Sequence, residues 1–255
     1  MVHVGKQVLV HSVFPSVFLL DIFLTLAGLV FGSFVSALSY RFPKGISIAK
    51  GRSFCPKCKK QITWHDNIPL LSFFFLGGKC RNCKRPISWR YPAIELTTAI
   101  GFLLIGPNFV QLVLFVLLEL IFIIDLENQI IPDRFIFVGL FFSLFIVHGS
   151  LFNSLFAGFL AASFLLLIHL ATRGRGMGLG DVKFAVLGGM IVGLNLSLTW
   201  LFLAFLTGGL VGTILLIGKK AGLKDKIAFG PFLVVAIPIA LMWGEKIIDI
   251  IKIYP

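Results

Sequence analysis

Long apolar runs alternate with short polar segments along almost the whole chain. A run of about 17 to 25 apolar residues spans the hydrocarbon core of a bilayer, and a shorter run can do so inside a bundle. The first run lacks a small-residue cleavage site, so we expect it to remain as a span and not to be removed as a signal. Eight predicted transmembrane helices cover residues 16–39, 91–106, 109–124, 135–148, 151–171, 184–194, 196–218 and 229–243.

Composition supports the same interpretation. Of the 255 residues 58% are hydrophobic, and 28 are Phe. A soluble domain of this length does not need so much apolar surface, because its own polar face must meet water. The sequence therefore predicts an all-α polytopic membrane protein of about eight transmembrane helices, with a small zinc-binding loop domain in the cytoplasm.

The charges are concentrated in one loop, residues 41–92. This loop holds twelve Lys or Arg and a single acid, Asp66, a balance of +11 within a net charge of +12. The positive-inside rule places it in the cytoplasm. Counting spans from there, Asp125, the 173–183 segment and the lysines at 219, 220, 224 and 226 lie on the cytoplasmic side, and both termini lie on the outer side.

Two carboxylates stand at edges of apolar runs on that side. Asp181 ends the glycine-rich segment 176–181 and precedes the apolar run from Phe184, while Asp125 follows the run 109–124. A charge at membrane depth costs about 3 kcal/mol or more and usually marks a pathway or a reaction centre. Gly178 and Gly180 would let another backbone approach closely. Alternatively, Asp181 only caps a helix, and the two acids are separate interfacial groups with partners such as Lys183.

Paired carboxylates have a definite chemical use. Two carboxyl groups within hydrogen-bonding range cannot both ionise, so one acts as a base and the other as an acid. In an aspartic protease the ionised member takes a proton from the attacking water, while the protonated member donates a hydrogen bond to the developing oxyanion. If Asp125 and Asp181 meet, they can hydrolyse a peptide bond at the membrane edge.

The four cysteines form two Cys-x-x-Cys pairs, Cys55 with Cys58 and Cys80 with Cys83, with 21 residues between the pairs. Such spacing converges four thiolates on a tetrahedral, closed structural Zn²⁺ site. Disulfides are the alternative, but they rarely persist in the cytoplasm. His65 is a poor spare ligand. The surrounding basic residues favour anionic lipid headgroups as a partner, and not nucleic acid.

In their order and spacing, these motifs resemble those of the prepilin peptidases, also called type IV leader peptidases. The likeness covers most of the chain and includes the Gly-x-Gly-Asp segment that ends at Asp181. The segments that carry it are residues 32–34, 40–43, 52–58, 64–72, 77–83, 90–96, 125, 131–133, 178–183 and 229–232.

The resemblance implies a bifunctional enzyme of the bacterial inner membrane. Such an enzyme cuts the basic leader from type IV prepilins or type II secretion pseudopilins at the cytoplasmic face, then methylates the new N-terminus with S-adenosylmethionine. It implies that Asp125 and Asp181 are catalytic, supported by Gly178, Gly180 and Lys183, and that Asp133 is not catalytic. Glu127 would either attract the basic leader or be solvated.

The resemblance also implies a division of labour. Residues 1–106 would carry methyl transfer, with Gly78 and Glu95 as site residues, and 107–255 would form a six-span peptidase. Ser36 stands where the family commonly has Asn, and no glycine-rich donor-binding fingerprint is visible. A peptidase without methyl transfer therefore stays open. So do a transporter that uses both aspartates as proton or cation ligands, although no internal repeat is obvious, and a zinc-stapled scaffold without catalysis.

Overall fold

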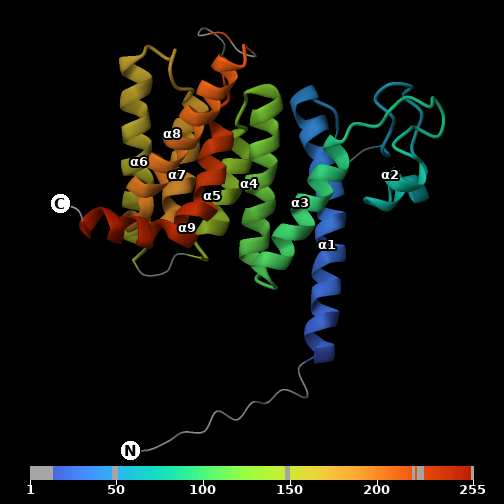
Figure 1. Ribbon diagram of the computed structural model, residues 1–255, viewed down its shortest axis with the longest axis horizontal. Helices are drawn as coiled ribbons and strands as arrows, with labels where there is room; N and C mark the ends of the chain where they lie inside the picture. The colour runs from blue at the N-terminus through green and yellow to red at the C-terminus, as the bar shows by residue number, and fades with distance from the viewer. Residues whose placement is uncertain (1–13, 48–50, 147–149, 220–221, 223–226, 254–255) are drawn as a thin grey trace, which may run out of the picture. The chain divides into compact units, whose positions relative to one another are not determined.

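A computed structural model describes residues 14–47, 51–146, 150–219, 222 and 227–253 (Figure 1). Within these residues the only β pairing is two isolated bridges, Phe54 with Gln61 and Lys79 with Pro86. Helices form everything else that is regular. They are α1 Phe14–Arg41, η1 Phe42–Lys44, η2 Trp64–Asn67, α2 Leu71–Phe75, α3 Arg90–Ile105, α4 Phe109–Asn128, α5 Asp133–Ser143, α6 Leu151–Ala171, α7 Leu179–Val192, α8 Leu194–Ile217 and α9 Gly230–Ile253.

Each of the eight predicted spans coincides with one long helix, which confirms the all-α membrane fold. Five helices, α1, α4, α6, α8 and α9, are long and apolar enough to cross a bilayer. The other three, α3, α5 and α7, have only 16, 11 and 14 residues. The number of eight spans therefore stays a prediction. The predicted end of the fourth span at His148, and Lys220, Lys224 and Lys226, lie outside the described residues.

The chain divides into two compact units. Unit 1 comprises Met1–Ala37 and Lys50–Asn108, and unit 2 comprises Leu38–Ala49 and Phe109–Pro255. The main division, after residue 108, falls beside the boundary at residue 106 expected from the sequence. The assignment of methyl transfer to the first part and peptide cleavage to the second concerns activity, and it stays a prediction.

In unit 1, two glycines bring α1 close to α3. A Cβ atom on Gly28 would lie 2.6 Å from the Cα of Ala99, and one on Gly32 would lie 2.7 Å from the Cα of Glu95. The two glycines are four residues apart, so they share one helix face. Small residues at this spacing allow membrane helices to pack backbone against backbone. Any larger side chain here would push α1 and α3 apart.

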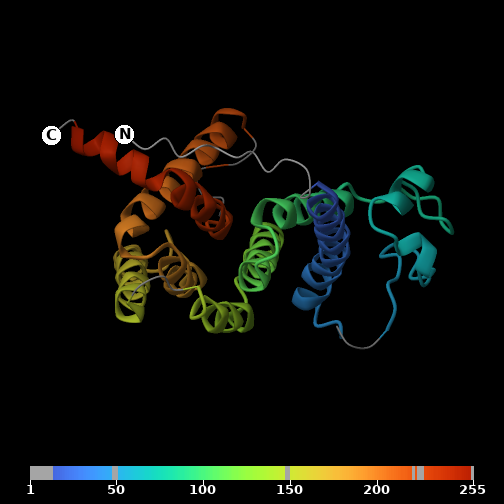
Figure 2. The same cartoon turned by 90° about the horizontal axis from the view of Figure 1, so that it is seen from below.

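In unit 2, α7 is the central helix and packs against α5, α6, α8 and α9. Its contact with α6 is the closest of these, because a Cβ atom on Gly189 would lie 2.7 Å from the Cα of Gly158. Views from two directions show the helices of this unit gathered around α7 (Figures 1 and 2). A short helix with neighbours on several sides is held rigidly, and α7 carries Asp181 in its first turn.

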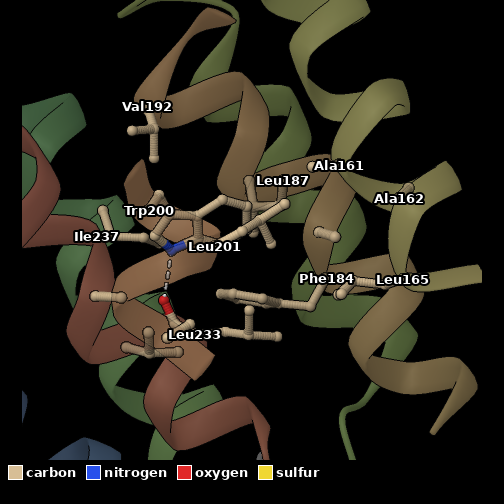
Figure 3. Close-up of a cluster of buried hydrophobic side chains, with 14 of the residues drawn as sticks. Ala161, Ala162, Leu165, Phe184, Leu187, Val192, Trp200, Leu201, Leu233 and Ile237 are labelled. Atoms are coloured by element: carbon tan, nitrogen blue, oxygen red, sulfur yellow. Dashed lines mark hydrogen bonds between the residues drawn. The ribbon is translucent and has the colours of Figure 1, made fainter. Parts of the chain in front are cut away.

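The core of unit 2 lies between α6, α7, α8 and α9 (Figure 3). Trp200 and Phe184 are fully buried in it. The indole Nε1–H of Trp200 donates a hydrogen bond of 2.9 Å to the backbone oxygen of Leu233, which joins α8 to α9. A buried indole needs such a partner. The core therefore fixes the start of α9 relative to the helix that carries Asp181.

Candidate active site

Asp181 lies in the first turn of α7, and its side chain is 8% exposed. Gly178 is the N-cap residue, and its backbone N–H donates a hydrogen bond of 3.1 Å to Oδ2 of Asp181. An acid at this position is stabilised by the unpaired amides and by the dipole of the helix. Asp181 thus has the capping role considered from the sequence. The cap also fixes the direction of the carboxylate.

Asp125 lies in the last turn of α4 and is 4% exposed. Its Oδ2 atom is buried and has no hydrogen-bond partner among the described residues. A buried acceptor left without a donor costs about 1–3 kcal/mol. Native structures contain few such atoms, and each one calls for an explanation. A carboxylate kept ready for water or substrate is such an explanation.

The two aspartates share one pocket. Its volume is about 310 Å³, and the negative charge of Asp125 acts directly on Asp181. The last turn of α4, the turn that follows it, and the start of α7 form the walls. The lining residues are Asp125, Gln129, Ile130, Ile131, Asp133, Gly178, Leu179, Gly180, Asp181 and Lys183. A peptide strand can reach both carboxylates from this pocket.

Glycines make room for these carboxylates and for the side chain of Ile131. A Cβ atom on Gly230 would lie 2.5 Å from Oδ2 of Asp125 and 3.0 Å from Cδ1 of Ile131. A Cβ atom on Gly180 would lie 3.2 Å from the Cβ of Ile131, and one on Gly178 would lie 3.1 Å from Oδ2 of Asp181. Ile131 is therefore wedged between the starts of α7 and α9, beside both acids.

Lys183 pairs with Asp133 and not with either buried aspartate. Its Nζ donates hydrogen bonds of 2.9 and 2.8 Å to the two carboxylate oxygens of Asp133. Both side chains are about half exposed, 53% and 51%. This ion pair joins α5 to α7 at the edge of the pocket. The alternative in which Lys183 neutralises one of the two candidate catalytic acids is not the observed arrangement.

The four cysteines come together, as their spacing predicts. Their sulfur atoms all lie within 4.8 Å of one another, and Sγ of Cys55 is 4.0 Å from Sγ of Cys83. All four are free thiols. A tetrahedral zinc site with Zn–S bonds of about 2.3 Å separates its sulfurs by about 3.8 Å, so a small contraction fits the ion. His65 is not part of this group, because its Nε2 pairs with Thr63.

The two cysteine knuckles have the same backbone geometry. In the first, the N–H of Lys59 donates to the oxygen of Cys55, and the N–H of Cys55 donates to the oxygen of Lys60. In the second, Lys84, Cys80 and Arg85 make the same two hydrogen bonds. Lys59 and Lys84 take left-handed φ angles of 61° and 56°. These two turns point four sulfurs at one centre.

Local interactions make the four thiols unequal. The backbone N–H of Cys83 lowers the pKa of Cys80 to about 7. At Cys58 the N–H of Lys60 lowers the pKa, but desolvation and the hydrogen bonds with Cys55 and Cys83 outweigh it and raise the pKa to about 11. The thiols therefore do not ionise together unless a cation compensates their charge. Zinc binding would release these protons.

Comparison with known proteins adds a decisive observation. Residues 26–109 match the model of the Bacterial Peptidase A24 N-terminal domain, and residues 112–213 match that of the Type IV leader peptidase family. A relative from Bacillus subtilis (strain 168) is 34% identical over 236 residues, which cover 87% of this chain and 94% of the relative. The chain belongs to the type IV leader peptidase family. It is therefore an enzyme, and the resemblance seen in the motifs is confirmed.

Other relatives of this leader peptidase are similar over comparable lengths. A protein of Pseudomonas aeruginosa strain PAO1 is 32% identical over 87% of this chain and 90% of its own length. One of Klebsiella pneumoniae is 38% identical over 67% of this chain and 85% of its own length. All three relatives are named prepilin leader peptidase/N-methyltransferase. No solved structure gave a significant match.

The two residues assigned to methyl transfer lie in unit 1 of the leader peptidase. Glu95 is buried in α3, and its Oε2 accepts a hydrogen bond of 2.8 Å from the backbone N–H of Leu70. Gly78 has φ +66°, and a Cβ atom on it would lie 3.3 Å from the ring of Phe73. The need for glycine at position 78 therefore has a structural reason. A role of either residue in methyl transfer stays a prediction.

The sequence interpretation gave no role to Gly230 or to Ile131, although both lie in segments that resemble the family. A usable signal was present at one of them. Gly230 stands directly before a proline at the start of an apolar run, where helices begin. Nothing in the local pattern indicates that the Gly230 backbone would meet Asp125, which is far away along the chain.

We expect Gly230→Ala to lower cleavage by about 10²-fold, because misplacing a reacting group by about 1 Å has effects of this size. The new Cβ atom would stand 2.5 Å from Oδ2 of Asp125 and force the carboxylate to move. Initial rates of cleavage of a pilin precursor by the purified variant measure the effect.

Gly209→Ala in α8 is the matched control, since a Cβ atom there would meet nothing within 4 Å. The control should cleave at the wild-type rate. Unchanged cleavage by Gly230→Ala would show that the close approach to Asp125 does not position that group.

Proposed function

We propose that this protein cleaves the leader peptide from type IV prepilins or pseudopilins and then methylates the new N-terminus, with Asp125 and Asp181 as the catalytic pair. One observation carries the assignment of the pair. Two buried carboxylates from separate helices line one pocket of a type IV leader peptidase. Asp133, the remaining acid of that pocket, is engaged by Lys183.

The pair would work by exchanging protons with water and substrate. The ionised carboxyl group accepts a proton from water as the water oxygen bonds to the peptide carbonyl carbon. The protonated carboxyl group donates a hydrogen bond to the carbonyl oxygen. Transfer of a proton to the amide nitrogen then allows the C–N bond to break. The hydrogen bond from Gly178 holds the Asp181 carboxylate in place for these steps.

The place of the pocket favours a membrane-anchored substrate. Asp125 ends one apolar helix and Asp181 begins another. A prepilin with its basic leader in the cytoplasm and its apolar helix in the bilayer presents the scissile bond at that level. This proposal places the enzyme in the bacterial inner membrane, with its active site toward the cytoplasm and both termini on the outer side.

The positive-inside distribution of charge supports this orientation. Glu127 is exposed in the last turn of α4. It would face the basic leader near the pocket.

Methyl transfer would belong to unit 1. S-adenosylmethionine supplies the methyl group from a positively charged sulfonium when it is bound. Among the described residues of unit 1, Glu95 is the only buried carboxylate, and its charge fits a cationic donor. Ser36 is buried on α1, and its backbone oxygen accepts a hydrogen bond of 3.2 Å from Arg90. The Ser36 backbone thus has a structural role that does not depend on its side chain.

The rival interpretations differ in what they explain. Membership of an enzyme family leaves a pure scaffold without support, and none of the relatives reported above is named as a transporter. A peptidase without methyl transfer would leave the buried Glu95 and the cysteine loop unexplained. We therefore keep both activities in the proposal.

The experiment uses two substrates and one variant. Asp181→Asn should methylate a precut pilin at the wild-type rate and should leave an uncut precursor unmethylated, because the acceptor amine exists only after cleavage. Transfer of a labelled methyl group from S-adenosylmethionine measures the effect. If the intact protein transfers none to the precut pilin, the chain is a peptidase only. Methylation of precut pilin that depends on Asp181 would contradict separate sites.

A further inference from the structure

A group of apolar side chains in the cysteine loop is strongly exposed. We call Trp64, Leu71, Phe74, Phe75 and Trp89 the aromatic surface. Phe75 is 87% exposed, Trp64 74% and Trp89 70%. Isolated exposed apolar residues are normal, but a patch of large aromatic residues marks a binding surface. Neither proposed activity uses these side chains.

The aromatic surface has a defined shape. The ring of Phe73 packs against Trp89 with centroids 4.9 Å apart, so Phe74 and Phe75 at the end of α2 point away from that contact. The turn after α2 uses Gly77 and Gly78, both with positive φ. This short helix is thus fixed by packing and by a tight turn.

Two contacts join α2 to the beginning of α3. The N–H of Leu70, which precedes α2, donates to the buried carboxylate of Glu95 on α3. Trp89, which packs on Phe73, directly precedes the first residue of α3. In both views α2 lies to one side of the start of α3 (Figures 1 and 2). The height of α2 along α3 is therefore set.

An exposed apolar stripe on α3 continues into the aromatic surface. Leu96, Ile100 and Leu104 are 49%, 47% and 82% exposed. Their spacing of four residues puts them on one face of the helix, and Trp89 lies two turns before Leu96 on the same face. In a membrane helix such a stripe meets lipid tails. Trp89 stands where the stripe ends, at the level where tryptophan concentrates in membrane proteins.

The charge around the aromatic surface fits anionic lipid headgroups. The loop of residues 41–92 carries a balance of +11, and Lys57, Lys60, Lys84 and Arg85 are exposed in its knuckles. A basic residue near an anionic bilayer contributes about 1 kcal/mol to the attraction. Exposed aromatic residues together with basic residues are typical of segments that lie in the membrane interface.

We propose that the aromatic surface inserts into the headgroup region of the bilayer that holds α1 and α3, with anionic lipids as its partner. The proposal rests on the membrane fold and not on either catalytic assignment. Insertion would hold the cysteine loop against the membrane surface.

Photo-crosslinking in vesicles tests this proposal on the full chain. The photoreactive amino acid p-benzoylphenylalanine replaces Phe75 in protein reconstituted into phosphatidylglycerol and phosphatidylethanolamine. The same group at Leu104 is the lipid-facing control, and at Gln61, an exposed knuckle residue, it is the water-facing control. Retention of one zinc ion per chain checks that each variant is folded. Mass spectrometry then counts lipid adducts.

The proposal predicts an adduct yield at position 75 close to that at position 104 and several-fold above that at position 61. Replacing phosphatidylglycerol with a zwitterionic lipid should lower the yield at 75 but not at 104. A yield at 75 no higher than at 61 would overturn the proposal. So would crosslinking to a second copy of the chain, or to an added pilin precursor, in place of lipid.

Discussion

Replacement of Asp125 or of Asp181 by Asn should abolish leader cleavage, with a loss on the order of 10³-fold or more in kcat/KM. Each change removes one site that can hold or release a proton and leaves the side-chain volume nearly unchanged. Because both acids serve the same proton transfers, the double variant should be no worse than either single one. Gel or mass analysis of a pilin precursor incubated with each purified variant in detergent measures the loss.

Asp133→Asn is the matched control in the same pocket. It breaks an exposed ion pair with Lys183, and such pairs contribute about 0–1 kcal/mol. We expect a loss of less than about tenfold, since tenfold corresponds to about 1.4 kcal/mol. Equal loss in Asp133→Asn and Asp125→Asn would mean that the wrong acid was chosen between positions 125 and 133. Substantial cleavage by either Asn variant at 125 or 181 would refute the pair.

Loss of the metal should affect the other activity. We expect one Zn²⁺ per chain, held by Cys55, Cys58, Cys80 and Cys83, and we expect Cys80→Ser with Cys83→Ser to release it. Four thiolates leave no open position for water, so the ion is structural. Structural zinc sites contribute their binding free energy to folding. Without the ion, the loop and the Leu70–Glu95 hydrogen bond should become disordered, and methyl transfer should fall by about 10²-fold or more.

Cleavage should fall much less in the same double variant, because Asp125 and Asp181 belong to unit 2. Asn82→Ser, between the two mutated cysteines, keeps all four thiols and is the control for local disturbance. Metal analysis of reduced protein and separate assays of the two activities measure the effects. Absence of zinc from carefully prepared protein, or equal loss of both activities, would count against a structural site confined to methyl transfer.

The helices were predictable because burial in a bilayer leaves a strong pattern in the sequence. Their ends were less so. The predicted span from residue 184 to 194 is α7, which begins at Leu179, because the Gly178 N–H and the Asp181 carboxylate form a cap that includes a polar first turn. Hydrophobicity alone places Asp181 before the helix, whereas the structure places it inside the first turn.

The cysteine site was predictable for a different reason. Each Cys-x-x-Cys turn is local, so its two sulfurs converge whatever the rest of the chain does. The partnership of Lys183 with Asp133 was not predictable, because it depends on how α5 packs against α7. The approach of Gly230 to Asp125 was not predictable either, because it depends on how α9 packs against α4. Such pairings follow from long-range packing, which single-sequence patterns do not encode.

One measurement tests the central claim most directly. The purified protein is incubated in detergent with a pilin precursor and S-adenosylmethionine, and the products are analysed by intact mass. We predict a pilin that has lost its leader and gained the mass of one methyl group, with both changes absent when Asp181→Asn acts on the uncut precursor. A precursor that stays uncut by the intact protein, while Asp181 is unaltered and zinc is bound, would contradict the assignment of Asp125 and Asp181 as a leader peptidase pair.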